Sequence, residues 1–139
     1  MSLDFEGKVA IVTGSGGGIG KGYALELAKR GAKVVVNDLG GAVDGSGGSL
    51  SAAEAVVQEI ESAGGEAMAN GANVCSEEDV KNMVQGPMEK WGRVDILINN
   101  AGILRDKSFA KMEWSDFVTV VNVHLMGSAL CAHSVFPIM

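Results

Sequence analysis

Cysteine is scarce in this sequence. Only Cys75 and Cys131 occur among its 139 residues. Two cysteines so far apart cannot form a disulfide framework, and no set of histidine and cysteine residues has the spacing of metal ligands. We therefore expect no disulfide scaffold and no metal site, and we interpret both cysteines as buried or partly buried thiols.

Clusters of positive charge and long apolar runs are also missing. The chain has 11 lysine and arginine residues against 17 acidic residues, for a net charge of -6, and no basic cluster that could neutralise nucleic-acid phosphates. No stretch reaches about eighteen apolar residues, and residues 1–6 lack the basic start and apolar core of a signal peptide. These absences argue against nucleic-acid and membrane partners, and they make the cytoplasm the default location.

What the sequence does have is an alternation of apolar runs with amphipathic segments. With 47% hydrophobic and 20% charged residues, the chain fits one globular domain with a buried core. Strands are expected near residues 8–13, 33–37, 67–70 and 94–99, and helices near 19–30, 51–63, 76–91 and from 113 or 114 toward 136. Alternation of this kind predicts an α/β fold with a doubly wound parallel sheet.

A glycine-rich segment follows the first expected strand. The apolar run at residues 9–12 leads directly into Thr13 to Gly20, which reads TGSGGGIG, and Asp38 closes the next apolar run. Glycines allow a sharp turn and close approach to a pyrophosphate, and the N–H groups of the following helix face its negative charge. A carboxylate at the next strand end accepts ribose hydroxyls. An isolated glycine cluster also fits a simple tight turn, but this combination predicts a dinucleotide site.

Two motifs give the chain its resemblance to a known family. The generic spacing Gly-x-Gly-x-x-Gly is absent in every register, whereas Thr13, Gly14, Gly18 and Gly20 match T-G-x-x-x-G-x-G, and residues 99–102 read NNAG after an apolar run. The sequence thereby resembles the short-chain dehydrogenases/reductases. That resemblance implies a Rossmann-type sheet in the strand order 3-2-1-4, followed by a long fifth helix. The cofactor-binding residues that it implies are Gly14, Ser15, Gly18, Ile19, Gly20, Asp38, Asn73, Val74, Asn100, Ala101 and Gly102.

Asp38 indicates which nicotinamide dinucleotide the chain takes. A carboxylate accepts hydrogen bonds from both adenosine ribose hydroxyls and repels a 2'-phosphate. Relatives that prefer NADP bring a basic residue into this neighbourhood, where this chain has Gly17 and Leu39. We therefore predict NAD over NADP, the alternative being a solvated aspartate at a strand end. Asn73 departs from the aspartate that the family often carries against the adenine.

The catalytic residues of the family are not found in these 139 residues. The family uses a serine, a tyrosine and a lysine, whereas the single tyrosine, Tyr23, has no lysine four residues after it. We interpret Tyr23 as a packing residue. The family's proton-relay asparagine lies three residues before a glycine, and His124 takes that position before Gly127. His124 is thus a candidate relay residue, with a core or interface position as the alternative.

The segments 37–41 and 102–109, with the glycine-rich insertion at 40–49, look like the (3R)-hydroxyacyl-CoA dehydrogenase unit of multifunctional β-oxidation enzymes. The insertion alone also fits a plain linker. The resemblance implies oxidation of a 3-hydroxyacyl thioester with NAD, a homodimer or homotetramer in the complete form, and a peroxisomal location in a eukaryote. We expect residues 1–139 to form an NAD-binding Rossmann domain that stops before the serine and the Tyr-x-x-x-Lys segment and is inactive alone. A 3-oxoacyl thioester reductase and a non-catalytic dinucleotide-binding module are the alternatives.

Overall fold

The computed structural model describes residues 3–41, 44 and 50–139. Most of the glycine-rich insertion at residues 40–49 therefore lies outside the described residues. Within them, four parallel strands form one sheet in the order β3-β2-β1-β4. The strands are β1 (Val9–Val12), β2 (Lys33–Asn37), β3 (Ala67–Asn70) and β4 (Ile96–Ile98). The predicted α/β fold and strand order are confirmed, although β1 and β4 are shorter than expected.

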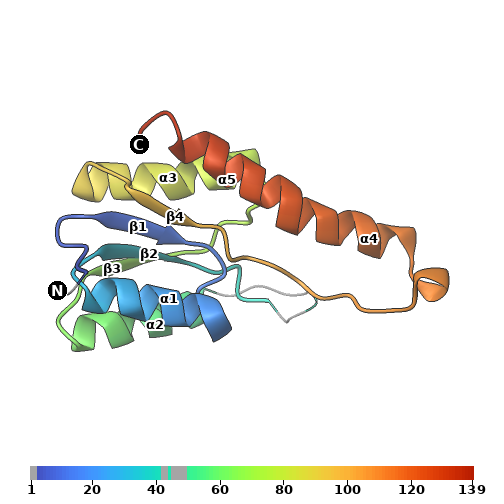
Figure 1. Cartoon of the computed structure of the whole chain (residues 1–139), viewed down its shortest axis with the longest axis horizontal. Coiled ribbons are helices and arrows are strands. Elements are labelled where there is room, and N and C mark those ends of the chain that lie inside the picture. Colours follow the sequence, from blue (N-terminus) through green and yellow to red (C-terminus); the bar gives the residue numbers. More distant parts are fainter. Residues whose placement is uncertain (1–2, 42–43, 45–49) are drawn as a thin grey trace.

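Helices cover both faces of this sheet, as Figure 1 shows. Helices α1 (Gly18–Lys29) and α2 (Ser51–Ser62) lie on one face, and α3 (Glu77–Trp91) and α5 (Gly127–Val135) lie on the other. Ser76 caps the N-terminus of α3, since its side chain accepts a hydrogen bond from the backbone N–H of Asp79 at 3.2 Å. This arrangement is the doubly wound architecture that the alternating sequence predicted.

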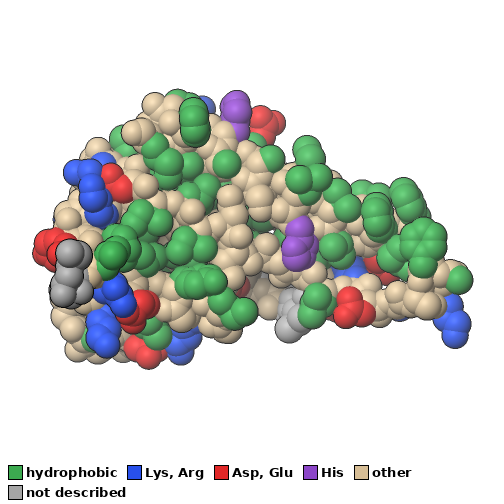
Figure 2. Space-filling view, viewed as in Figure 1, with side chains coloured by type: hydrophobic (Ala, Val, Ile, Leu, Met, Phe, Trp, Pro, Cys, Tyr) green, Lys and Arg blue, Asp and Glu red, His purple; other side chains and the backbone are tan. Residues whose placement is uncertain are grey.

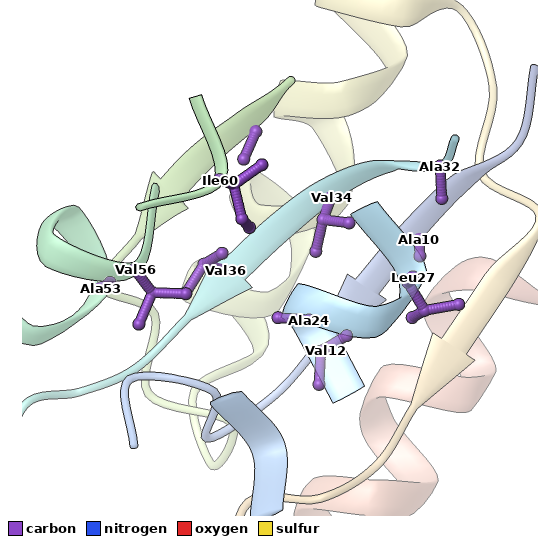
Figure 3. Packing of buried hydrophobic residues seen from close by; sticks show 11 residues of the cluster. Ala10, Val12, Ala24, Leu27, Ala32, Val34, Val36, Ala53, Val56 and Ile60 are labelled. Atoms are coloured by element: carbon purple, nitrogen blue, oxygen red, sulfur yellow. The ribbon is translucent and has the colours of Figure 1, made fainter. Parts of the chain in front are cut away.

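The core follows the two-residue period of the strands. Ala10, Val12, Val34 and Val36 face α1 and α2, where Figure 3 shows them among the side chains of those helices. The intervening residues Ile11 and Val35 belong to the second cluster, on the face of α3 and α5. Because both faces are covered, β1 and β2 are apolar at nearly every position rather than at alternate ones.

The last helix is interrupted by a π-helical turn. Instead of one regular helix, α4 (Trp114–Val121) runs into the π-helix η2 (Asn122–Met126) and then into α5, after the short 3-10 helix η1 (Phe109–Lys111). The continuous segment Trp114–Val135 is long and apolar enough to cross a membrane by length and composition alone. A single helix of this kind is weak evidence for a membrane span, and the predicted absence of a membrane partner stays a prediction.

Apolar side chains gather on the outside of this last helix. Trp114 is 67% exposed, Leu125 63% and Met126 56%, and Figure 2 shows hydrophobic side chains crowded over the α4 end of the molecule. Large apolar patches of this sort mark surfaces that another part of a protein, or another copy, covers.

Two of the packing interpretations are wrong. Cys75 is exposed, because it lies in the turn that precedes α3 rather than beneath a helix, whereas Cys131 on α5 is buried as expected. Burial raises the pKa of the Cys131 thiol to about 11. Tyr23 is 45% exposed, because it lies on the outer side of α1 while Ala24 and Leu27 on the same helix face the sheet. Tyr23 is therefore a surface residue of α1 rather than a core residue.

Candidate cofactor-binding site

Three strand ends meet at the candidate site. The glycine loop follows β1, Asp38 follows β2, and Asn100 to Gly102 follow β4, all at the carboxyl edge of the sheet. In open parallel sheets this edge carries ligand sites, because the loops leaving neighbouring strands converge there. The structure thus brings the two sequence motifs and the acidic residue together.

Thr13 and Asn100 join the glycine loop to the segment after β4. The Thr13 hydroxyl accepts hydrogen bonds from the backbone N–H groups of Asn100 and Ala101, both at 3.0 Å. In return, Asn100 Nδ2 donates to the carbonyl oxygens of Thr13 and Gly14, both at 3.0 Å. Four hydrogen bonds therefore fix the two motifs against each other, and Thr13 is 1% exposed.

Close backbone approach explains two of the glycines. Gly14 has φ +63°, and a Cβ there would lie 2.8 Å from Ala101 Cα. A Cβ at Gly20 would overlap Asn100 Nδ2 and lie 2.5 Å from the Gly14 carbonyl oxygen. Only glycine fits such positions without moving the backbone. The motif glycines therefore let α1 and the segment after β4 pack directly on the loop.

The outer side of the loop is open. A Cβ at Gly17 or Gly18 would have no heavy atom within 4 Å. Helix α1 has no side chain capping its N-terminus and no acidic residue in its first turn, whereas α3 has Ser76 as its cap and three acidic residues. Ile19, beside this opening, is 72% exposed. The N–H groups and dipole of α1 are thus available to an anion, and this geometry fits a pyrophosphate.

The Asp38 carboxylate is held in place by backbone groups. Its Oδ2 accepts a hydrogen bond from Gly16 N–H at 2.9 Å, and its Oδ1 accepts from Gly40 N–H at 2.6 Å. The side chain is only half-buried, so each oxygen keeps a lone pair for another donor. Asp38 therefore lies next to the glycine loop in an orientation that suits two neighbouring ribose hydroxyls.

The structure uses other predicted residues differently. Ser15 is fully buried, and its N–H and hydroxyl donate to the carbonyl oxygens of Asn37 and Val12, at 2.8 and 2.7 Å. Its side chain therefore does not reach the open side of the loop. Asn73 and Val74, which the family resemblance assigns to the cofactor site, lie in the loop beyond Asn70, where β3 ends.

Both residues of this loop have structural contacts of their own. Asn73 Oδ1 accepts a hydrogen bond from the backbone N–H of Cys75 at 2.9 Å. Val74 is 7% exposed and packs so closely on α5 that a Cβ at Gly127 would lie 2.7 Å from Val74 Cγ2. Asn73 is half-buried and lies at the same edge of the sheet as Asp38, whereas Val74 points into the core.

His124 lies in the π-helix and contacts the segment after β4. Its Nε2 is 3.1 Å from the backbone nitrogen of Ile103 and 3.0 Å from the Ile103 carbonyl oxygen, and a Cβ at Gly102 would lie 2.6 Å from His124 Cε1. The imidazole also lines a cavity of about 380 Å³ between this segment and α4. The extra residue of a π-turn re-aims side chains and is frequent at functional sites. Here the turn contains His124, whose ring lies against Gly102.

Sequence reasoning missed two residues of this region. Thr13 was read only as part of a motif, yet its hydroxyl is the acceptor that joins the two loops. Asn37 was read as the end of a strand, yet it is 1% exposed and its amide bonds to the loop after β3. A polar residue that ends an apolar strand was the available signal for both. Within the described ranges, no group of three or more metal-ligating side chains lies together.

Comparison with known proteins identifies the family of this chain. The short chain dehydrogenase family matches residues 8–139. Similar curated proteins include peroxisomal multifunctional enzyme A of Dictyostelium discoideum, 60% identical over 92% of this chain and 28% of that protein. The peroxisomal hydratase-dehydrogenase-epimerase of Saccharomyces cerevisiae is 51% identical over 99% of this chain and 15% of that protein. The resemblance to the multifunctional enzymes is thereby confirmed.

Solved structures similar to this chain are also dehydrogenases. A short chain dehydrogenase from Mycobacterium avium has a TM-score of 0.86 and 46% identity, covering 96% of this chain and 46% of the other. A 7α-hydroxysteroid dehydrogenase complexed with NADH and 7-oxo glycochenodeoxycholic acid has a TM-score of 0.87 and 36% identity, covering 98% of this chain and 49% of the other. The chain spans less than half the length of each of these proteins. It belongs to the short-chain dehydrogenase family.

Proposed function

We propose that this chain binds NAD across the carboxyl ends of β1, β2 and β4 and forms the cofactor-binding part of a dehydrogenase. The observation that carries the proposal is the open side of the glycine loop at Gly17 and Gly18, beside an uncapped N-terminus of α1. A pyrophosphate there accepts hydrogen bonds from free N–H groups in a favourable dipole. The similarity to a dehydrogenase complexed with NADH supports a nicotinamide dinucleotide in this position.

The preference for NAD over NADP rests on Asp38. Its carboxylate, already held by Gly16 and Gly40, accepts both adenosine ribose hydroxyls in this proposal. A 2'-phosphate brought to the same place is repelled, and neither Gly17 nor Leu39 supplies a compensating positive charge.

The other contacts follow the course of the dinucleotide. We assign the pyrophosphate to the loop and the first turn of α1, the adenine to the loop after β3, and the nicotinamide ribose to the segment after β4. The residues predicted for these contacts are Gly14, Ser15, Gly18, Ile19 and Gly20, then Asn73 and Val74, then Asn100, Ala101 and Gly102, of which Ser15 and Val74 are buried and support their loops from beneath. His124 has the proton-relay position, where it lines the cavity beside Gly102.

The substrate in this proposal is a secondary alcohol, with a 3-hydroxyacyl-CoA as the preferred class. The similarity to peroxisomal multifunctional enzymes and to a hydratase-dehydrogenase-epimerase supports it. NAD, when bound, supplies the acceptor for the hydride that leaves the alcohol carbon. This chain's own part is to bind the cofactor and to keep its nicotinamide end beside the cavity that His124 lines.

The proposal also covers what the 139 residues do alone. We assign residues 1–139 to a single NAD-binding Rossmann unit without the serine and the Tyr-x-x-x-Lys segment, which holds NAD but does not oxidise a substrate by itself. The exposed apolar surface of α4 and η2 supports a homodimer or homotetramer of the complete form. The location is cytoplasmic by default and peroxisomal in a eukaryote, in line with the named peroxisomal relatives.

Replacing Asp38 by alanine tests the cofactor proposal. Charge-assisted hydrogen bonds contribute about 1.5–3 kcal/mol, so we expect the Kd for NAD to rise about tenfold or more. The Kd for NADP changes less, so the difference in affinity between NAD and NADP becomes smaller. Asp4→Ala, which removes the same charge from the exposed N-terminal segment, is the matched control. Unchanged NAD affinity in titration calorimetry of Asp38→Ala removes Asp38 from the site.

A separate assay tests the substrate. We expect no NADH from the 139-residue chain mixed with NAD and a 3-hydroxyacyl-CoA. NADH should appear with a protein that carries this chain together with the serine and Tyr-x-x-x-Lys segment. NADH formation by the 139-residue chain alone contradicts the proposal that these residues hold NAD but do not oxidise a substrate by themselves. Oxidation of NADPH with a 3-oxoacyl thioester that outpaces NAD reduction favours a reductase instead.

A further inference from the structure

Asn37 is a buried polar residue whose side chain is not exposed at the candidate site. It is the last residue of β2, directly before Asp38, and it is 1% exposed. Its Nδ2 donates to Asn70 Oδ1 at 2.9 Å and to the Ala72 carbonyl oxygen at 3.0 Å. Burying an amide without partners is costly, so these two bonds are what makes asparagine acceptable at this position.

The partners fix which way the amide points. Asn70 Oδ1 also accepts a hydrogen bond from the backbone N–H of Ala72 at 2.9 Å, so that atom must be an oxygen. The Ala72 carbonyl is likewise only an acceptor. Asn37 must therefore present its NH₂ group to both, and a side chain that only accepts hydrogen bonds cannot replace it.

The same residue links three segments of the proposed adenosine site. Its backbone carbonyl accepts from the Ser15 N–H of the glycine loop at 2.8 Å, and its amide bonds to the loop after β3 that leads into Asn73. The next residue, Asp38, donates its N–H to the Asn70 carbonyl at 3.0 Å. A shift of Asn37 thus moves the glycine loop, the ribose carboxylate and the adenine loop relative to one another.

We infer that Asn37 is a positioning residue for the adenosine half of the cofactor. It acts through the Asn37–Asn70–Ala72 hydrogen-bond cluster, which sets the distance between Asp38 and the loop that carries Asn73. This inference rests on the proposed function, because it concerns the same dinucleotide site. Asn37 itself makes no contact with the ligand.

Two substitutions with the same chemistry test the inference. Asn37→Asp removes the donor and sets a carboxylate against Asn70 Oδ1 and the Ala72 carbonyl. Asn70→Asp adds the same charge within this cluster but keeps an acceptor for both bonds that Asn70 Oδ1 receives. The probe is AMP, which carries the adenosine end alone, and its Kd is measured by titration calorimetry at pH 7.5. Circular dichroism checks that each protein is folded.

We expect the Kd for AMP to rise about tenfold in Asn37→Asp and less than about twofold in Asn70→Asp, since one loses a buried donor pair and the other does not. A carboxyl group regains a donor when it is protonated. The ratio of the Asn37→Asp Kd to the wild-type Kd should therefore fall toward one as the pH is lowered to about 5. A residue that only supported folding would show neither the difference between the variants nor this pH profile.

Several outcomes overturn the inference. One is a folded Asn37→Asp protein that binds AMP with wild-type affinity. Another is an equal rise of the Kd for AMP in both variants, because the added charge rather than the lost donor then explains the effect. If Asn37→Asp does not fold, Asn70→Ala removes the acceptor from the half-buried side of the pair, and unchanged AMP affinity in that variant also overturns it. Failure of the wild-type protein to bind AMP or NAD refutes the proposed function itself.

Discussion

Replacing Gly20 by alanine tests the close contact between α1 and the loop that it follows. The added Cβ would overlap Asn100 Nδ2 and lie 2.5 Å from the Gly14 carbonyl oxygen. Relief of both contacts requires displacement of the Asn100 side chain and also movement of α1 or the loop, because the Gly14 carbonyl belongs to the backbone. Displacement breaks the two hydrogen bonds from Asn100 Nδ2 to the loop carbonyls.

The magnitude follows from these two changes together. Two lost hydrogen bonds cost about 2 kcal/mol, and overpacking with a backbone shift costs about 1–3 kcal/mol. Alanine has a higher helix propensity than glycine, which offsets about 1 kcal/mol. We therefore expect Gly20→Ala to lower the free energy of unfolding by about 2–4 kcal/mol and to weaken NAD binding, because the loop carbonyls and α1 no longer pack together.

Gly22 is the matched control on the same helix. It is exposed, and a Cβ there would have no heavy atom within 4 Å. Gly22→Ala should raise the free energy of unfolding by up to about 1 kcal/mol through helix propensity alone. Urea denaturation followed by circular dichroism measures both variants. Equal free energies of unfolding for Gly20→Ala and Gly22→Ala refute the reasoning, since an added Cβ clashes at Gly20 and meets nothing at Gly22.

Three further predictions address other parts of the structure. Thr13→Val should lower the free energy of unfolding by about 1–2 kcal/mol in urea denaturation, because the part-buried N–H of Ala101 loses its acceptor and that of Asn100 keeps only the Ile98 carbonyl, whereas Thr13→Ser keeps the hydroxyl and most of the stability. The hydrogen bond from Arg93 lowers the pKa of Asp95, so the stability that this carboxylate contributes is complete above about pH 4 and is lost as the pH falls through the lowered pKa. The difference in unfolding free energy between wild type and Asp95→Asn should therefore shrink below about pH 4, and a difference that is constant with pH contradicts this. In thiol labelling of the native protein only Cys75 should react, since Cys131 is buried with its pKa raised to about 11, and a second thiol should appear in urea.

The parts of the fold that sequence could predict are those fixed by local patterns. Alternating apolar runs fixed the strands, and the side-chain oxygen of Ser76 before an acidic first turn marked the start of α3. The order of the strands and the two cofactor motifs came instead from resemblance to a family. Motif residues such as Gly14 and Gly20 were identified by that resemblance, but only the structure shows that each faces a specific backbone neighbour.

The features that sequence could not predict depend on contacts between distant residues. The amide of Asn37 donates a hydrogen bond to Asn70, 33 residues away, and no local sequence pattern predicts that pair. The π-turn at 122–126 lies in a segment whose apolar pattern is that of an ordinary helix, so the local sequence does not distinguish it. Exposure of Tyr23 was missed because an aromatic residue on an amphipathic helix is usually buried, whereas here small and aliphatic residues of α1 face the sheet.

Titration calorimetry of the purified protein with NAD and with NADP tests the central claim most directly. The open glycine loop, the uncapped α1 and the Asp38 carboxylate together predict one NAD site per chain, with NADP binding at least about tenfold more weakly because a phosphate meets a carboxylate. Absence of NAD binding by the folded protein, or tighter binding of NADP than of NAD, contradicts the account.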